Sequence, residues 1–107
     1  LENAGITFGL ITDAPFVPIE GQLLQAALYV KNGLSREMAL KCLTINNAII
    51  TDIDSRVGSL EPGKDADLVI WDVEPLATLS QAGIVIIDGQ IAYRRKAGES
   101  NVDYQKL

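Results

Sequence analysis

The chain has 107 residues, 48% of them hydrophobic, and a net charge of −5. This length is typical of about one domain, and the hydrophobic content excludes a disordered tail. The negative charge argues against nucleic acid and anionic membrane surfaces as partners, because both attract basic patches, and no apolar run approaches the ~20 residues of a membrane span.

The first five residues, LENAG, are typical of the last turn of a helix that Gly5 closes in a left-handed conformation. The chain also begins with Leu1 instead of Met. Together these features indicate a piece cut from a larger protein, and the alternative is a complete domain processed at its N-terminus.

An apolar strand is predicted over Ile6–Thr12, and it ends on an acid, Asp13. Because side chains alternate along a strand, one face carries Gly9, Ile11 and Asp13, and the other carries Phe8, Leu10 and Thr12. The run is apolar on both faces, as in an interior parallel strand. In closed (β/α) barrels the residues at the C-terminal strand ends carry the chemistry, but a simple turn also uses Asp at such a place.

A loop and a helix are predicted next. Pro15 and Pro18 prevent regular pairing, and the loop that they shape could contribute substrate contacts. Apolar residues then recur at helical spacing from about Ile19 to Lys31, and Gly33 ends this helix.

A second helix is predicted to begin after Ser35, which would cap its N-terminus, with Glu37 placed to complement the helix dipole. Cys42 lies in its apolar stripe and is expected in the core. As the single cysteine, Cys42 excludes an internal disulfide and suits a reducing cytoplasm. A short helical segment is expected over residues 44–50.

The second half of the chain changes to β periodicity. The Pro62-Gly63 pair predicts a tight turn, and a strand follows from Ala66 to Trp71. Two β-rich runs joined by Asp88-Gly89 predict a hairpin with a type I′ turn. The chain therefore divides near Asp52–Arg56 into two structural units.

Four segments resemble the metal-dependent amidohydrolases: ITDAP at 11–15, GLSREMALKCLTINNA at 33–48, GSLEPGKDADLVIWD at 58–72 and IIDGQIAY at 86–93. They follow the order and spacing of that family and cover nearly the whole chain. Each segment is weak evidence alone, but four in register are specific. The similarity is greatest to the imidazolonepropionase-like and dipeptidase-like members.

The resemblance implies a (β/α)8 barrel beside a small β-sandwich assembled from both chain ends. The chain is then an α/β fragment: residues 1–52 hold the last barrel strand and the following helices, and residues 53–107 hold the C-terminal share of the sandwich. The implied activity of the whole protein is hydrolysis of an amide or cyclic amide C–N bond by a metal-activated water, and the fragment alone is expected to be inactive.

By the same match, Asp13 is the acid at the end of the eighth strand, which in the family contacts the divalent metal and takes a proton from its bound water. Asp13 is therefore expected as both catalytic residue and metal ligand, and Zn²⁺ is the expected metal. Zinc sites use at least three protein ligands, and this chain has no histidine. The remaining ligands are expected upstream of Leu1.

Other conspicuous residues are interpreted as structural. Two residues depart from the family: Ala14 stands where relatives often have a polar residue, so a substrate contact by this side chain is not expected, and Asn47 stands where they commonly have Pro, which should loosen a helix boundary. Lys64 and Asp65 are expected to be turn and surface residues, and Asp67 to orient the preceding turn.

Two other functions fit the sequence. One is a non-catalytic amidohydrolase-like scaffold, and the other is a free-standing interaction module without enzymatic activity. The expected partners are a small-molecule substrate and the rest of the parent chain, with no nucleic acid and no membrane. The fragment alone is expected to self-associate, because much of its apolar surface would lack a cover.

Overall fold

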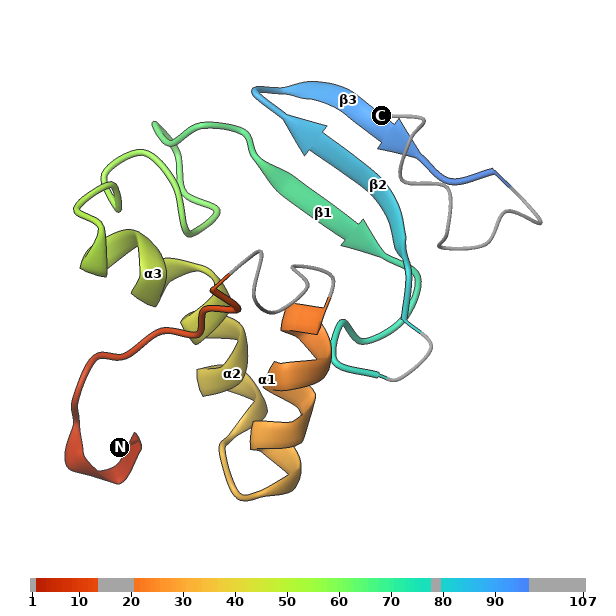
Figure 1. Ribbon diagram of the computed structural model, residues 1–107. Coiled ribbons are helices and arrows are strands. Elements are labelled where there is room, and N and C mark those ends of the chain that lie inside the picture. Colours follow the sequence, from red (N-terminus) through yellow and green to blue (C-terminus); the bar gives the residue numbers. More distant parts are fainter. Residues whose placement is uncertain (1, 14–20, 78–79, 97–107) are drawn as a thin grey trace.

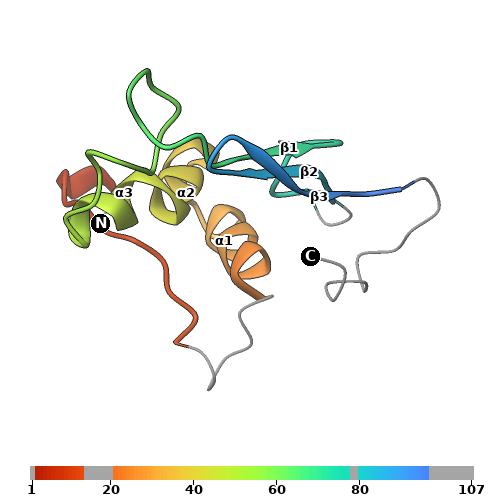
Figure 2. The same cartoon turned by 90° about the horizontal axis from the view of Figure 1, so that it is seen from above.

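The computed structural model describes residues 2–13, 21–77 and 80–96 (Figure 1). The helical elements are η1 (Glu2–Ala4), α1 (Gln22–Lys31), α2 (Arg36–Leu43) and α3 (Ile45–Ile50), and the strands are β1 (Leu68–Trp71), β2 (Ala82–Ile87) and β3 (Gln90–Arg94). Seen edge on, the strands form a single layer beside the helices (Figure 2). Within the described ranges, every helix is too short or too polar to cross a bilayer.

The helix boundaries follow from local chemistry. Helix α1 ends at Lys31, and Gly33 adopts a φ of 113°, a conformation that favours glycine, as the chain turns toward α2. The hydroxyl of Ser35 accepts the backbone N–H of Met38 at 3.1 Å and so caps α2. At the N-terminus, Gly5 closes the turn of η1 with a φ of 68°. These signals are confirmed, as is the short third helix.

The three strands form an antiparallel sheet in the order β1-β2-β3. Asp88 and Gly89 join β2 to β3 with φ values of 51° and 76°, which both central positions of a type I′ turn require, so the predicted hairpin is confirmed. A carboxylate oxygen of Asp67 accepts the backbone N–H of Asp88 at 2.8 Å. The expectation that Asp67 orients the Pro62-Gly63 turn is therefore wrong, because its side chain holds the hairpin turn instead.

The predicted strand over Ile6–Thr12 does not form. This segment is paired with no strand in the part of the chain that the structure describes. A strand requires neighbours for its backbone N–H and C=O groups, and the nearest partners here are helices. The side chains from Leu10 to Thr12 nevertheless alternate between two sides, because Leu10 and Thr12 are buried whereas Ile11 is 74% exposed.

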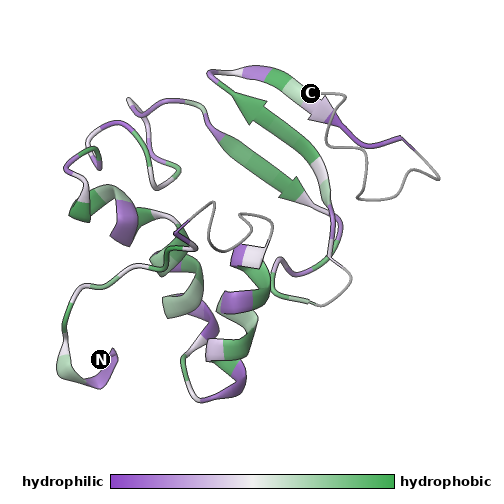
Figure 3. Cartoon of the chain, in the orientation of Figure 1, coloured by the Kyte–Doolittle hydropathy of each residue, from purple (hydrophilic) through white to green (hydrophobic). Residues whose placement is uncertain are grey.

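A small core lies where this segment meets the helices. It consists of Leu10, Ala26, Ala39, Cys42 and Leu76. Cys42 is fully buried, as expected, and burial raises the pKa of its thiol. Strands β1 and β2 are hydrophobic along most of their length (Figure 3), yet several of their apolar side chains are exposed, among them Val69, Ile70 and Ile87.

Candidate functional site

Asp13 ends the 6–13 segment, and its carboxylate is exposed. No described residue forms a hydrogen bond or an ion pair with it; Ala14 and the loop with Pro15 and Pro18 lie outside the described residues. Its φ is 56°, a left-handed conformation that costs a side-chain-bearing residue about 1–2 kcal/mol. Asp52 and Asp88 share this conformation in turns, so the backbone angle alone does not identify a catalytic acid.

Three side-chain amides bind the backbone of the segment that leads to Asp13. The amide nitrogen of Asn46 donates to the carbonyl of Phe8 at 2.9 Å, and those of Asn47 and Gln22 donate to the carbonyl of Leu10 at 3.1 and 3.2 Å. We call Gln22, Asn46 and Asn47 the amide clamp. The Leu10 N–H adds a fourth contact by donating to the carbonyl of Cys42 at 3.1 Å. The clamp fixes the segment on the helices in place of strand pairing.

Asn47 has a larger role than the sequence indicated. A Cβ atom on Gly9 would lie 1.8 Å from Oδ1 of Asn47, so the glycine leaves the space that this amide fills. Gly9 therefore faces α3. The alternation of side chains predicted that Gly9 would share a face with Ile11 and Asp13, and this prediction is wrong for Gly9. Asn47 does not simply loosen a helix boundary, since it tethers the segment that carries Asp13.

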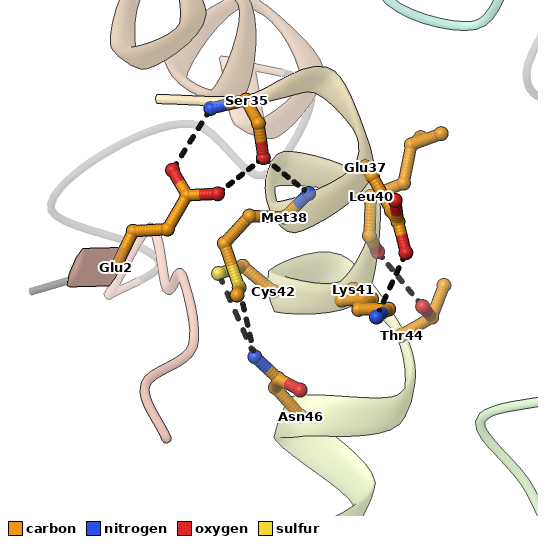
Figure 4. A network of polar contacts seen from close by, with 9 residues as sticks. All are labelled: Glu2, Ser35, Glu37, Met38, Leu40, Lys41, Cys42, Thr44 and Asn46. Carbon is orange, nitrogen blue, oxygen red and sulfur yellow. Dashed lines mark hydrogen bonds and ion pairs between the residues drawn. The ribbon is translucent and has the colours of Figure 1, made fainter. Parts of the chain in front are cut away.

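The N-terminus of α2 is tied to the start of the chain. One carboxylate oxygen of Glu2 accepts the Ser35 hydroxyl at 2.5 Å, and the other accepts the Ser35 backbone N–H at 3.0 Å (Figure 4). The hydrogen bonds from Ser35 lower the pKa of Glu2. Because this hydroxyl already caps the helix and the chain has no histidine to activate it, Ser35 has a structural role.

Lys64 and Asp65, which follow the Pro62-Gly63 turn, each form an ion pair. Asp65 pairs with Arg56 at 2.8 Å, and Lys64 pairs with Glu61 at 3.0 Å. These contacts hold the turn and leave no arrangement suited to acid–base catalysis. The structure agrees with the interpretation of Lys64 and Asp65 as turn residues, but the Lys64 side chain is only 13% exposed, so the expectation that it is a surface residue is wrong.

A metal site cannot be assembled from the described residues alone. They contain no group of three or more His, Cys, Asp and Glu side chains that could hold an ion. The exposed carboxylate of Asp13 is an oxygen donor suitable for a divalent cation, but a zinc site needs at least three protein ligands. The described residues therefore do not complete a zinc site by themselves.

A large hollow of the described surface lies away from Asp13, which is not among its lining residues. It has a volume of about 580 Å³ and opens between α2, α3 and β1, with mostly apolar walls that include Leu40, Leu43 and Trp71. The carboxylate in its lining belongs to Asp67, and one of its oxygens accepts the backbone N–H of Asp88 in the hairpin turn. This hollow has the character of an uncovered core and not of a polar catalytic site.

Comparisons with known proteins give a consistent result. Residues 1–96 match the sequence profile of the Amidohydrolase family. The chain is similar to amidohydrolase tasK of Hapsidospora irregularis (33% identity, 83% of this chain, 9% of that protein) and to an imidazolonepropionase of Shewanella baltica (35% identity, 75% and 20%). It also superposes on the crystal structure of an amidohydrolase from Thermotoga maritima with a TM-score of 0.84 and 42% identity, over 89% of this chain and 25% of that one. The chain thus spans a minor part of the relatives that it matches.

Proposed function

Because the chain belongs to the amidohydrolase family, we propose that it is the C-terminal part of a metal-dependent hydrolase that cleaves carbon–nitrogen bonds in small molecules. The observation that carries this proposal is Asp13, an exposed carboxylate at the end of a segment that the amide clamp fixes on the helices. The match to 25% of the Thermotoga maritima amidohydrolase supports an activity that belongs to the longer protein and not to this chain alone.

We place the 6–13 segment as the last strand of a (β/α)8 barrel and the sheet as part of a β-sandwich, with residues 1–52 and 53–107 in the two domains. Burial supports this placement: Leu10 and Thr12 are buried, and Leu10 belongs to the core with residues of α1 and α2, whereas Ile11 is exposed beside Asp13. An exposed isoleucine is unfavourable in water, and a neighbouring barrel strand and the barrel interior would cover it. The same placement puts Asp13 at the end of the barrel where such enzymes carry their chemistry.

In this proposal Asp13 is both a ligand of a divalent metal, with Zn²⁺ as the expected ion, and the acid–base residue. When bound, such a metal would lower the pKa of a coordinated water far below that of bulk water, to about 7. The Asp13 carboxylate would accept a proton from the attacking water and deliver it to the nitrogen that leaves, so that one side chain serves both halves of the hydrolysis. The exposure of Asp13, which has no hydrogen-bond partner among the described residues, supports this role.

The substrate is proposed to be an amide or a cyclic amide. The imidazolonepropionase and amidohydrolase names of the relatives support this class. We propose no nucleic-acid or membrane partner, in agreement with the net charge of −5, and a cytoplasmic location, in agreement with the single buried thiol of Cys42.

Hydrolysis by the full-length protein tests this function. The purified protein would be assayed against a panel of cyclic amides and acylated dipeptides, before and after removal of metal by a chelator and after addition of Zn²⁺. We expect release of the product amine or carboxylate to stop on chelation and to return with Zn²⁺. Activity that survives complete metal removal would contradict the proposal, and so would inactivity on every C–N substrate when metal is bound.

A further inference from the structure

The amide clamp assigns a role to Asn46 beyond stability. We infer that Asn46 is a positioning residue: through its hydrogen bond to the Phe8 carbonyl, it sets the register of the 6–13 segment on the helices and so the place of the Asp13 carboxylate. This inference rests on the proposed function of Asp13.

Asn46 is bound in a way that leaves its amide few alternatives. The residue is only 9% exposed, and its amide nitrogen lies 2.9 Å from the Phe8 carbonyl oxygen. The other atoms within reach are the sulfurs of Met38 at 3.6 Å and Cys42 at 3.8 Å, which are weak acceptors (Figure 4). A buried amide without a strong acceptor is costly, so Asn46 selects the register that presents the Phe8 carbonyl.

Asn46 is also the member of the clamp without a substitute. The Leu10 carbonyl accepts from both Gln22 and Asn47, so either donor can be lost while the other remains. Among the described residues, the Phe8 carbonyl accepts from Asn46 alone. Removal of the Asn46 amide therefore leaves a part-buried carbonyl without its donor and frees the segment at Phe8.

The distance from the clamp to the acid is short. Asp13 follows Phe8, the residue that Asn46 binds, by five residues, so a slip of the segment at Phe8 would shift the Asp13 carboxylate. A shift by one residue would also exchange the buried and exposed sides that Leu10 and Ile11 now occupy. Misplacement of a reacting group by about 1 Å can cost about 10²-fold in rate, so a small change in register would lower turnover without removing the acid.

Two measurements on the full-length protein test this inference, with Asn46→Leu as the variant and Asn32→Leu as its control. Leucine keeps the size of the side chain and removes its donor. Asn32 also donates its amide to a backbone carbonyl, that of Leu28 at 2.8 Å, but it is exposed at the end of α1 and its amide does not bind the backbone of the 6–13 segment.

The first measurement is hydrogen–deuterium exchange of the peptide that covers residues 6–13, made without metal. Asn46→Leu should accelerate exchange there, including the Leu10 amide, while α1 stays protected; Asn32→Leu should not. The second is steady-state kinetics of the folded, metal-loaded fraction. We expect Asn46→Leu to lower kcat by at least ~10-fold with KM changed by less than ~3-fold, the signature of lost positioning.

Each other outcome contradicts the inference. Unchanged exchange at 6–13 would do so, as would a loss of activity equal to the loss of folded protein. If Asn46→Leu does not fold, the same two measurements are made on Asn46→Ala. If neither variant folds, Asn46 contributes to the stability of the fold and the inference that it is a positioning residue is contradicted. A fully active Asp13→Asn protein would overturn the proposed function itself, whereas an inactive Asp13→Asn protein with a normal Asn46→Leu protein would overturn this inference alone.

Discussion

The amide of Asn47 occupies the space that a Cβ atom on Gly9 would fill, with Oδ1 only 1.8 Å from that position. The two residues are 38 positions apart in sequence, and each is suited to the other: glycine admits the amide, and the amide reaches past it to the Leu10 carbonyl. The fit between them places the 6–13 segment close against α3.

The first prediction follows from this fit. Gly9→Ala in the full-length protein should lower the free energy of unfolding by about 1–3 kcal/mol, because the new methyl group must displace the Asn47 side chain and part of the clamp. Chemical denaturation measures this change. Gly21→Ala is the matched control, because nothing lies within 4 Å of its Cβ position and its φ is −77°, and it should change stability by less than ~0.5 kcal/mol. Equal effects at both positions would contradict the packing described.

A second prediction concerns the cap of α2. Ser35→Ala removes the hydroxyl that accepts the Met38 N–H and donates to Glu2, so it should destabilise the protein by about 1 kcal/mol. Thermal or chemical denaturation measures the loss. Ser55→Ala, at an exposed turn residue, is the control and should be nearly neutral. A neutral Ser35→Ala would show that the cap is not formed in solution.

The Glu2–Ser35 contact also predicts a dependence on pH. The pKa of Glu2 lies below its ordinary value of 4.5, mainly because the carboxylate accepts hydrogen bonds from Ser35. A depressed pKa stabilises the folded state above the unfolded-state pKa, and that contribution is lost as the pH falls through the folded-state pKa. Glu2→Gln should therefore be less stable than the natural protein at about pH 6, and the difference should shrink on acidification below 4.5.

A double-mutant cycle provides the control for this pH effect. In a Ser35→Ala background, the hydroxyl partner of Glu2 is absent, so Glu2→Gln should have a smaller effect on stability. Urea denaturation of the four proteins at several pH values gives the coupling. A stability difference between the natural protein and the Glu2→Gln variant that stays constant with pH would contradict the lowered pKa.

The apolar surface predicts how the isolated chain behaves. Among the described residues, the large apolar side chains with more than half of their surface exposed are Ile6, Ile11, Leu24, Leu28, Ile50, Leu60, Val73, Ile87 and Ile91. Burial of apolar surface contributes roughly 25 cal/mol per Å², so copies of the 107-residue chain should self-associate. Sedimentation at increasing concentration measures this, and Leu24→Ser with Leu28→Ser should reduce it. A compact monomer at high concentration would contradict the expected need for a cover.

The sequence predicted those features that neighbouring residues determine. Gly33, Ser35 and the Asp88-Gly89 pair act within a few residues of their own position, so their turns and caps could be read directly from the sequence. The prediction of a strand over Ile6–Thr12 was wrong for the described residues, because a strand requires a partner strand, and helices lie at that place.

The amide clamp was missed for a related reason. Asn46 and Asn47 contact residues 38 and 37 positions away, and hydrophobic periodicity says nothing about which polar side chain meets a distant carbonyl. Two consecutive asparagines inside an otherwise apolar helical segment are a usable signal, because a buried amide requires a partner. Asp13 was found from its place after an apolar run and from the family resemblance, and its catalytic role stays a prediction.

The turnover of Asp13→Asn in the full-length, metal-supplied enzyme tests the central claim most directly. Asparagine keeps the shape of the side chain but removes its charge and its capacity to accept a proton, so kcat should fall by at least ~10²-fold. Asp65→Asn, which loses only a surface ion pair with Arg56, is the control and should retain nearly full activity. Metal content, measured on both proteins, separates lost chemistry from lost metal. Full activity of Asp13→Asn, or equal losses at Asp13 and Asp65, would contradict the assignment of Asp13 as the acid–base residue.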